Sequence, residues 1–229
     1  MPQSISQPIN RFVEVSHTIE SGMQTYPGLP VPVAQILLDY DASRERYHGE
    51  SEFQIASLHL CGNTGTYVDS PRHRIRGGVD LAGLALDSVA HVPVIKIDVR
   101  DSTTRGIGPE RFRGLSLAGK AVVVNTGWAR HWRTERYLET NPFLTADACE
   151  YLVQAGARLV GIDSLNIDDI EDFKRPAHTQ LLGAGIPVCE HMTNLEALEA
   201  AGGYLHAAPI AWVGGTTFPV RAYVVYPGV

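Results

Sequence analysis

The stretch Asn63-Thr64-Gly65-Thr66-Tyr67-Val68-Asp69-Ser70-Pro71-Arg72-His73 combines a glycine and a proline, which shape the backbone, with an acid and an imidazole. Gly65 allows close backbone approach, while Pro71 fixes its own φ and favours an extended residue before it. Asp69 and His73 are therefore expected at a defined separation in a rigid loop that follows a strand. An ordinary surface turn uses the same residue types, so this stretch alone leaves a turn and a metal or catalytic site as alternatives.

The composition predicts one mixed α/β domain over residues 1–229. The chain has 229 residues, of which 44% are hydrophobic, and single α/β or barrel domains reach this length. Its 22 glycines and 14 prolines suit many short strands joined by defined turns. Residues 1–10 are expected to be flexible, and no internal repeat or linker divides the remainder.

Charge and cysteine content exclude several classes of partner. The net charge is -6 and the sequence pI is near 5.8, with no cluster of lysine and arginine, so neither nucleic acid nor an anionic membrane is expected as a partner. No signal-like start and no apolar run of ~18 residues is found, which predicts a cytoplasmic protein. The three cysteines lack CxxC spacing and indicate neither a disulfide framework nor a thiolate zinc site.

Apolar patterns predict a series of short strands. Alternation from Val13 to Ile19 places His17 on the inner face, either as a core histidine or as a site residue. The charged segment Ser43–Glu52 is expected to be a solvated loop. Further strands are expected at Ala34–Leu38, Phe53–Leu60, Val92–Val99, Ala121–Asn125, Leu159–Ile162, Ile186–Cys189 and Phe218–Val225. Of these, Val92–Val99 and Ala121–Asn125 are expected to be buried on both faces, and Phe218–Val225 to be central in the sheet.

Three helices are expected in the second half of the chain. Thr145 suits the N-cap of the first, which lies between two predicted strands and gives a β-α-β unit. Pro176 suits the first turn of the second helix and places His178 near its start. Thr193-Asn194-Leu195-Glu196 has capping-box spacing and predicts a third helix that continues through Ala201.

Four side chains that can bind metal lie at boundaries between these elements: Asp69, His73, His178 and Glu190. Two imidazoles and two carboxylates can form the ligand set of a zinc or manganese ion. Helix caps and surface ion pairs are the alternative. Trp128 follows a strand-end glycine, where an aromatic residue either walls a substrate site or covers the core.

The opening stretch resembles the signature His-x-Gly-Thr-His-x-Asp-x-Pro-x-His of the cyclase family, which contains bacterial kynurenine formamidases and isatin hydrolases. Asn63 and Tyr67 stand where the signature has its first two histidines. Further matches keep their order along the chain: Thr126-Gly127-Trp128, Gly161-Ile162-Asp163, Arg175-Pro176-Ala177-His178, Leu181-Leu182-Gly183, Glu190-His191-Met192-Thr193-Asn194-Leu195 and Phe218-Pro219-Val220-Arg221-Ala222. The resemblance implies a swivelling β/β/α fold with a central mixed sheet, a homodimer or homotetramer, and metal-dependent hydrolysis of small amides and lactams.

The resemblance also implies a ligand set. Among the ligands of the family's two-metal members, those that this chain keeps are Asp69, His73, His178 and Glu190. Because two signature histidines are absent, the resemblance implies one divalent ion, zinc or manganese. In the one-metal arrangement of the isatin hydrolases only Asp69 would remain, and a metal-free protein is then the alternative. An asparagine amide and a neutral tyrosine phenol are weak ligands for such metals.

The leading hypothesis is a hydrolase that cleaves a small amide, lactam, ester or lactone by metal-activated water. His73, Glu190 and Tyr67 are its candidate catalytic residues, for proton transfer and for hydrogen bonding to the oxyanion. A metal-independent hydrolase or lyase, and a non-catalytic protein that binds small molecules, are the alternatives. The candidate substrate-binding residues are Asn63, Trp128, His17 and Arg72.

Overall fold

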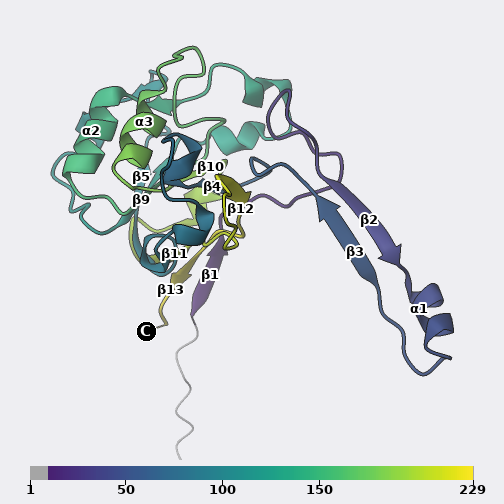
Figure 1. Cartoon of the computed structure of the whole chain (residues 1–229). Helices are drawn as coiled ribbons and strands as arrows, with labels where there is room; N and C mark the ends of the chain where they lie inside the picture. The colour runs from purple at the N-terminus through teal and green to yellow at the C-terminus, as the bar shows by residue number, and fades with distance from the viewer. Residues whose placement is uncertain (1–9, 229) are drawn as a thin grey trace, which may run out of the picture.

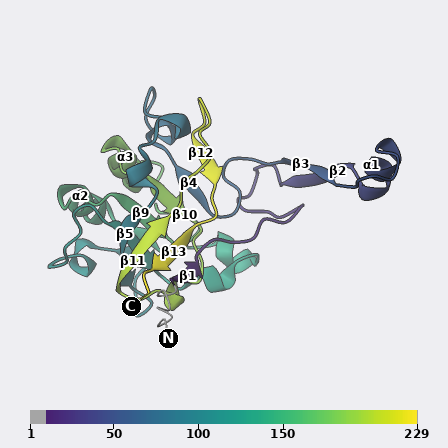
Figure 2. The same ribbon diagram turned by 90° about the horizontal axis from the view of Figure 1, so that it is seen from below.

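The computed structural model describes residues 10–228, in which a nine-stranded mixed sheet carries two helices and a long arm projects from the body (Figures 1 and 2). The mixed α/β fold with a central mixed sheet is confirmed. Of the predicted flexible start, residues 1–9 lie outside the described residues. Asn10 is described, and its side chain accepts a hydrogen bond from the Gly228 backbone N–H at 3.1 Å. The strands of the sheet follow the order β1-β13-β11-β5-β7-β9-β10-β4-β12.

Four parallel strands form the centre of the sheet: β5 (Val92–Asp98), β7 (Ala121–Asn125), β9 (Leu159–Ile162) and β10 (Val188–Glu190). β7 is buried along its whole length, as predicted, whereas β5 alternates between buried and more accessible positions. The predicted helix α2 (Ala146–Gln154) connects β7 to β9, which gives the expected β-α-β unit. Thr145 caps α2 by accepting a hydrogen bond from the Ala148 backbone N–H at 3.3 Å.

Antiparallel strands extend the sheet on both sides. β4 (Tyr67–Asp69) pairs with β10, and β12 (Thr217–Pro219) pairs with β4. On the other side, β11 (Ala201–His206) pairs with β5, β13 (Tyr223–Tyr226) with β11, and β1 (Arg11–Glu14) with β13. The short strands β6 (Gly106–Ile107) and β8 (Phe143–Leu144) form a separate parallel pair.

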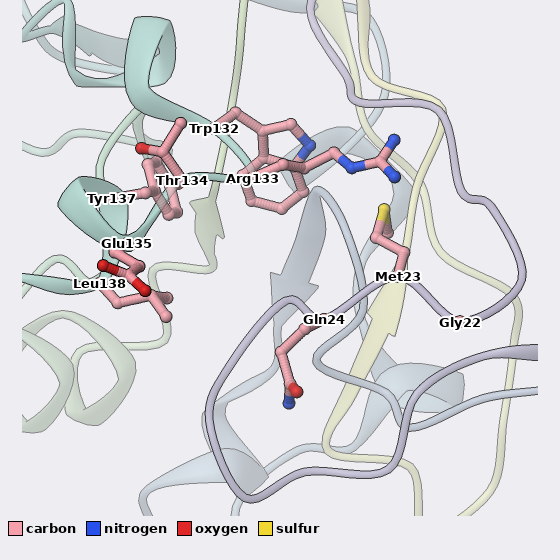
Figure 3. A pocket seen from close by; sticks show the side chains of 9 residues that line it. All are labelled: Gly22, Met23, Gln24, Trp132, Arg133, Thr134, Glu135, Tyr137 and Leu138. Carbon is pink, nitrogen blue, oxygen red and sulfur yellow. The ribbon is translucent and has the colours of Figure 1, made fainter.

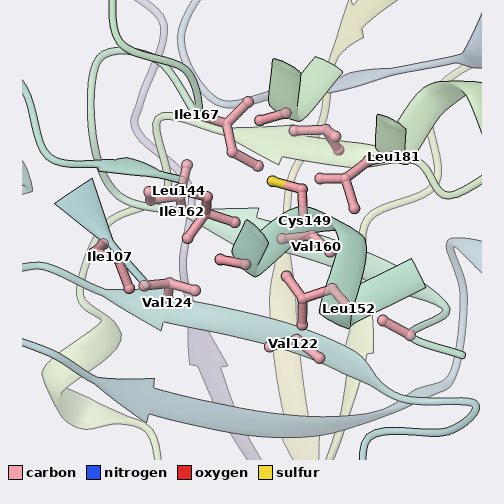
Figure 4. Close-up of a cluster of buried hydrophobic side chains, with 14 of the residues drawn as sticks. Ile107, Val122, Val124, Leu144, Cys149, Leu152, Val160, Ile162, Ile167 and Leu181 are labelled. Atoms are coloured by element: carbon pink, nitrogen blue, oxygen red, sulfur yellow. The ribbon is translucent and has the colours of Figure 1, made fainter. Parts of the chain in front are cut away.

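Alternate residues of the central strands fill two hydrophobic clusters on opposite faces of the sheet. Val122, Val124 and Val160 face the first cluster, which packs under α2 and α3 (Pro176–Gly183) and includes Cys149 (Figure 4). Val123 and Leu159 face the second cluster, together with residues from the antiparallel strands. The central strands are therefore covered on both faces.

The arm consists of the antiparallel strands β2 (Val33–Leu38) and β3 (Ile55–His59), with α1 (Tyr40–Arg46) at its tip (Figures 1 and 2). Both strands were predicted. The loop predicted for Ser43–Glu52 is wrong at its start, because α1 runs through Arg46. Asp39 caps α1 by accepting a hydrogen bond from the Ala42 backbone N–H at 2.8 Å.

Three other predictions differ from the structure. The strand expected from Val13 to Ile19 ends at Glu14. The stretch Asn63–His73 is a loop only in part, since it contains the buried strand β4. The single strand expected at Phe218–Val225 is divided into β12 at the sheet edge and β13 near the opposite edge, because the chain leaves the sheet after Pro219 and the Val220 N–H bonds Thr66.

The helix predicted from Thr193 to Ala201 is also wrong. Only one 3-10 turn forms, at Leu195–Ala197, and Ala201 already begins β11. Asn194 has a φ of 55° and does not cap the turn with its side chain. Instead, its side-chain amide donates to the Glu14 carbonyl of β1 at 3.0 Å. No helix in the described part of the chain has the length and hydrophobicity needed to cross a membrane.

Candidate active site

Strand β4 places Tyr67 and Asp69 beside β10. In the sheet register Tyr67 faces Glu190 and Asp69 faces Val188. Gly65, with a φ of 63°, brings the chain into β4 by a close approach to Ile19, and its backbone N–H donates to Thr25 at 2.8 Å. After β4, Pro71 begins a 3-10 turn that directs His73 back towards Asp69. The His73 Nε2 lies 3.9 Å from Asp69 Oδ1, so the predicted pair is brought together.

His178 reaches the same place from the first turn of α3. Asp168 accepts hydrogen bonds from the Ala177 N–H at 2.6 Å and the His178 N–H at 3.2 Å, which anchors the start of the helix. The same carboxylate lies 2.6 Å from His178 Nδ1. Nε2 is therefore turned inward, 3.8 Å from both Asp69 Oδ2 and Glu190 Oε2. Burial tends to raise the pKa of Asp168, but the contacts with His178 and the backbone hold this pKa below its usual value.

Glu190 lies between a phenol and a backbone donor. The Tyr67 hydroxyl donates to Oε2 at 2.7 Å, and the Ile167 N–H donates to Oε1 at 2.6 Å. Burial raises the pKa of Tyr67 well above its usual value; the charges of Glu190 and Asp69 add to that rise, and a hydrogen bond with Asn63 opposes it. Tyr67 is therefore a neutral hydrogen-bond donor. Asn63 in turn accepts a hydrogen bond from the Thr217 hydroxyl at 3.0 Å.

Asp69 is the unsatisfied group of this site. Both of its carboxylate oxygens are buried, and neither has a hydrogen-bond partner among the described residues. Burial raises its pKa well above the usual value, and the charge of Glu190 raises it further. Buried polar groups normally have partners, so two unpartnered oxygens on one carboxylate indicate a missing cation or donor.

The donors around Asp69 fit a divalent metal. Asp69, His73 and His178 each offer one ligand atom, and these atoms lie within 4.8 Å of one another. Burial, followed by the charge of His178, lowers the pKa of His73 to about 4, so its imidazole is neutral and can act as a ligand at pH 7. A carboxylate and two imidazoles are ligands for zinc and manganese. The Asp168 carboxylate behind His178 also matches the arrangement that orients metal-binding histidines.

Asp168 and Arg175 were missed by the sequence predictions. Arg175 has a φ of 49° just before α3, and its guanidinium Nη2 lies 3.1 Å from His178 Nδ1 and 3.3 Å from Nε2. Arg175 also lines a hollow of about 220 Å³, together with Tyr26, Asn166 and Phe173. The only sequence signal for these residues was the matched segment before His178 and the acidic run that precedes it.

The structure places the other predicted residues outside the Asp69 cluster. Trp128 is buried beside Tyr137 and Leu165, and its indole N–H donates to the Tyr137 carbonyl at 3.1 Å. Arg72 is exposed, and its backbone N–H bonds the Val79 carbonyl. His17 stacks on Trp132, with 4.0 Å between ring centroids and an interplanar angle of 7°.

The chain is similar to known proteins over nearly its whole length. The family described as Putative cyclase matches residues 13–169. The kynurenine formamidase of Bacillus cereus is 28% identical over 217 residues, which cover 94% of this chain and 97% of that protein. The kynurenine formamidase of Salinibacter ruber is 29% identical over 216 residues, or 92% of this chain and 95% of that protein.

Solved structures share the fold. An isatin hydrolase bound to the product analogue thioisatinate superposes with a TM-score of 0.82 at 22% identity, over 95% of this chain and 93% of that one. A structure described as a potential metal-dependent hydrolase with cyclase activity gives a TM-score of 0.78 at 23% identity, over 95% and 98% of the two chains. At these identities the likeness concerns the fold.

Proposed function

Because the chain belongs to the Putative cyclase family, we propose that it is a hydrolase that cleaves a small amide, lactam, ester or lactone at a site with one divalent metal ion. The observation that carries the proposal is the Asp69 carboxylate, whose two unpartnered oxygens face the imidazoles of His73 and His178. The names of the relatives, kynurenine formamidase and isatin hydrolase, support an aryl formamide or a fused lactam as the substrate class.

Asp69, His73 and His178 would hold the ion, with Glu190 as the fourth candidate ligand. A bound zinc or manganese ion polarises a carbonyl group and lowers the pKa of its water towards ~7. Asp168 is the positioning residue, because its bond to Nδ1 keeps Nε2 of His178 turned towards Asp69.

Glu190 is the residue proposed to move the proton, and Tyr67 is proposed as a hydrogen-bond donor to the oxyanion. Glu190 Oε2 accepts the Tyr67 phenolic hydrogen bond at 2.7 Å, which holds this carboxylate in position. If Glu190 does not bind the metal, it can take a proton from water at Oε2 and pass it to the leaving nitrogen or oxygen. His73, half-buried at the edge of the cluster, is the second proton carrier if it does not bind metal.

Metal analysis combined with a substrate panel tests this proposal. Protein purified without chelator is assayed for zinc and manganese and then for turnover of formanilide, isatin and an aryl lactone. We expect close to one equivalent of metal, and turnover that falls at least 100-fold in Asp69→Asn. Less than a tenth of an equivalent, with no turnover after metal is added, would refute the metal-dependent mechanism.

A metal-independent acid–base mechanism is the second candidate, and Arg175 is the observation that favours it. Its guanidinium lies within 3.3 Å of both ring nitrogens of His178 and supplies a permanent positive charge beside the acidic cluster. In that mechanism Asp69, His73 and Tyr67 would act as the acid and base. Turnover that survives chelation and is lost in Arg175→Gln would favour this candidate.

The arm supports a homo-oligomer. On one face of the hairpin the register places Ala34 opposite Leu58 and Ile36 opposite Ala56, so that face is apolar throughout. Ile36 is 57% exposed and Leu58 is 52% exposed, and the arm extends away from its own body (Figure 2). A two-stranded hairpin is only marginally stable without further packing. We therefore propose that a second copy of this chain covers the arm.

The same chain carries a second exposed apolar patch, at Ile210, Trp212 and Val213, which offers the partner a matching surface. Light scattering after gel filtration tests the assembly. We expect a multiple of the 25.0 kDa chain mass for the native protein and for Gln35→Lys, which lies on the other face of the hairpin. Ile36→Lys should shift the mass towards one chain. A native protein that elutes as a single chain would contradict the proposal.

A further inference from the structure

A second pair of histidines, His17 and His191, lies near Tyr67. The Thr66 hydroxyl connects their backbones, because it accepts from the His17 N–H at 3.0 Å and donates to the His191 carbonyl. His191 is fully buried, has a φ of 54°, and its ring centroid is 5.2 Å from that of Tyr67. A bulky residue held in the left-handed region by such contacts is typical of functional sites.

Tyr137 fixes the proton of His191. Its hydroxyl lies 2.9 Å from His191 Nδ1, and that hydroxyl has no other hydrogen bond among the described residues. If the phenol donates, Nδ1 accepts and the ring proton is on Nε2. The opposite arrangement would leave the phenolic proton without an acceptor in a buried site, which is costly. His191 therefore presents an N–H donor at Nε2.

Neither histidine has a partner for its Nε2. Both His17 Nε2 and His191 Nε2 are buried without a hydrogen bond among the described residues. The indole of Trp132 joins the two rings, since it stacks on His17 and meets His191 edge-on, with 5.7 Å between centroids. Two unpartnered ring nitrogens beside one aromatic side chain indicate a binding position for a polar group.

A hollow of about 290 Å³ is lined in part by Trp132 and Tyr137 (Figure 3). Its lining comes from two segments, Gly22–Gln24 and Trp132–Leu138. Trp132 and Tyr137, which line it, are the same two aromatic residues that contact His191. Trp132 is half-buried, lines the hollow and stacks on His17, so the subsite proposed below requires its indole to rotate.

We propose that this hollow and the histidine pair form a subsite for the planar part of an uncharged carbonyl compound, whose carbonyl oxygen accepts a hydrogen bond from His191 Nε2. As the substrate subsite of the hydrolase it rests on the proposed function, and Tyr67, which contacts both His191 and Glu190, connects the two parts. The aromatic walls suit a flat ring. Among the described residues that line the hollow, Arg133 is the one cationic side chain, and it is paired with Glu20 at 2.8 Å, which favours an uncharged ligand.

Binding to chelator-treated protein tests the subsite without depending on turnover. Benzamide, benzoate and toluene share one ring but differ in the carbonyl group and in charge, and calorimetry measures their affinities. We expect benzamide to bind at least 10-fold more tightly than the other two. His191→Asn, which suits the left-handed backbone, should weaken benzamide about 10-fold, as expected for one hydrogen bond, and leave toluene unchanged.

Two further variants separate this role from a structural one. His91→Asn is the matched control, because His91 also has a φ of 55° but stacks on Tyr204 elsewhere, and it should bind benzamide as the native protein does. Tyr137→Phe should weaken benzamide and change the ¹⁵N signals of His191 from the Nε2-protonated tautomer to a mixture.

Equal benzamide affinity in the native protein and His191→Asn, or benzoate binding as tight as benzamide, would overturn the subsite. That result could stand beside metal-dependent turnover, in which case only the subsite fails. Binding as expected, without turnover on any substrate, would leave the subsite in place and refute the hydrolase.

Discussion

Replacing Asp69 with asparagine tests two linked claims: that this carboxylate destabilises the metal-free protein, and that it binds a metal. Both oxygens are fully buried and have no hydrogen-bond partner within residues 10–228, and an unsatisfied buried group costs about 1–3 kcal/mol, more when it is charged. The amide has the same shape and is also polar, but it carries no charge, so the substitution removes the cost of burying a charge. In chelator-treated protein we therefore expect Asp69→Asn to raise the free energy of unfolding by about 1–3 kcal/mol. Each kcal/mol shifts the Tm by roughly 2–4 °C in a chain of this size.

Added metal should reverse the order of the two proteins. A ligand at 100 times its Kd stabilises a folded protein by about 2.7 kcal/mol, and Asp69→Asn should lose most of that gain. Thermal unfolding with chelator and then with zinc measures both effects. Asp163→Asn is the matched control, since Asp163 is buried but bonded to Thr126, and its zinc-dependent shift should equal that of the native protein. If Asp69→Asn is less stable than the native protein under chelation, or keeps the full zinc shift, the metal assignment is wrong.

Three other substitutions give distinct outcomes. Asp168→Asn should lower zinc affinity by 10- to 100-fold in a chelator competition, because His178 loses the carboxylate that orients it. His17→Phe keeps the stacking on Trp132 but removes a titrating group. Burial lowers the pKa of His17 from 6.5 to about 4. The unfolded chain therefore takes up a proton at His17 before the folded protein does, so the native protein loses stability as the pH falls below 6.5. Between pH 7 and pH 5 the free energy of unfolding, measured in urea, should fall by about 2 kcal/mol more in the native protein than in His17→Phe. Thr145→Ala should cost about 1 kcal/mol in the same assay without changing metal binding, because α2 loses its N-cap.

Local sequence signals predicted the secondary structure correctly wherever a segment is stabilised by its own residues. Thr145 caps α2 through a contact three residues away, and Pro176 begins α3. The apolar run at Ala121–Asn125 gives a fully buried strand because strands on both sides and helices above it exclude water. The fold class follows from such patterns, since each depends on periodicity and turn chemistry along a short stretch.

Tertiary contacts decided the segments that were predicted wrongly. Thr193-Asn194-Leu195-Glu196 has the spacing of a capping box, but Asn194 bonds the distant Glu14 carbonyl instead of the helix start. β2 and β3 were correctly expected as strands, yet their sequences do not show that both would leave the body and lie in solvent. Asp168 was missed for a similar reason. Its role depends on a loop returning to the start of α3, which no spacing in the sequence encodes.

Asn63 and Tyr67 stand at the two positions where the family signature has histidines. The Tyr67 hydroxyl donates to Glu190 on β10, and Asn63 accepts from the Thr217 hydroxyl on β12, so each of the two residues forms a hydrogen bond to a neighbouring strand. Replacing either residue with histidine would break its hydrogen bond. Asp69 has gained no such partner and stays unsatisfied between two imidazoles. The part of the site that fits a metal, around Asp69, is therefore also the part whose carboxylate has no hydrogen-bond partner among the described residues.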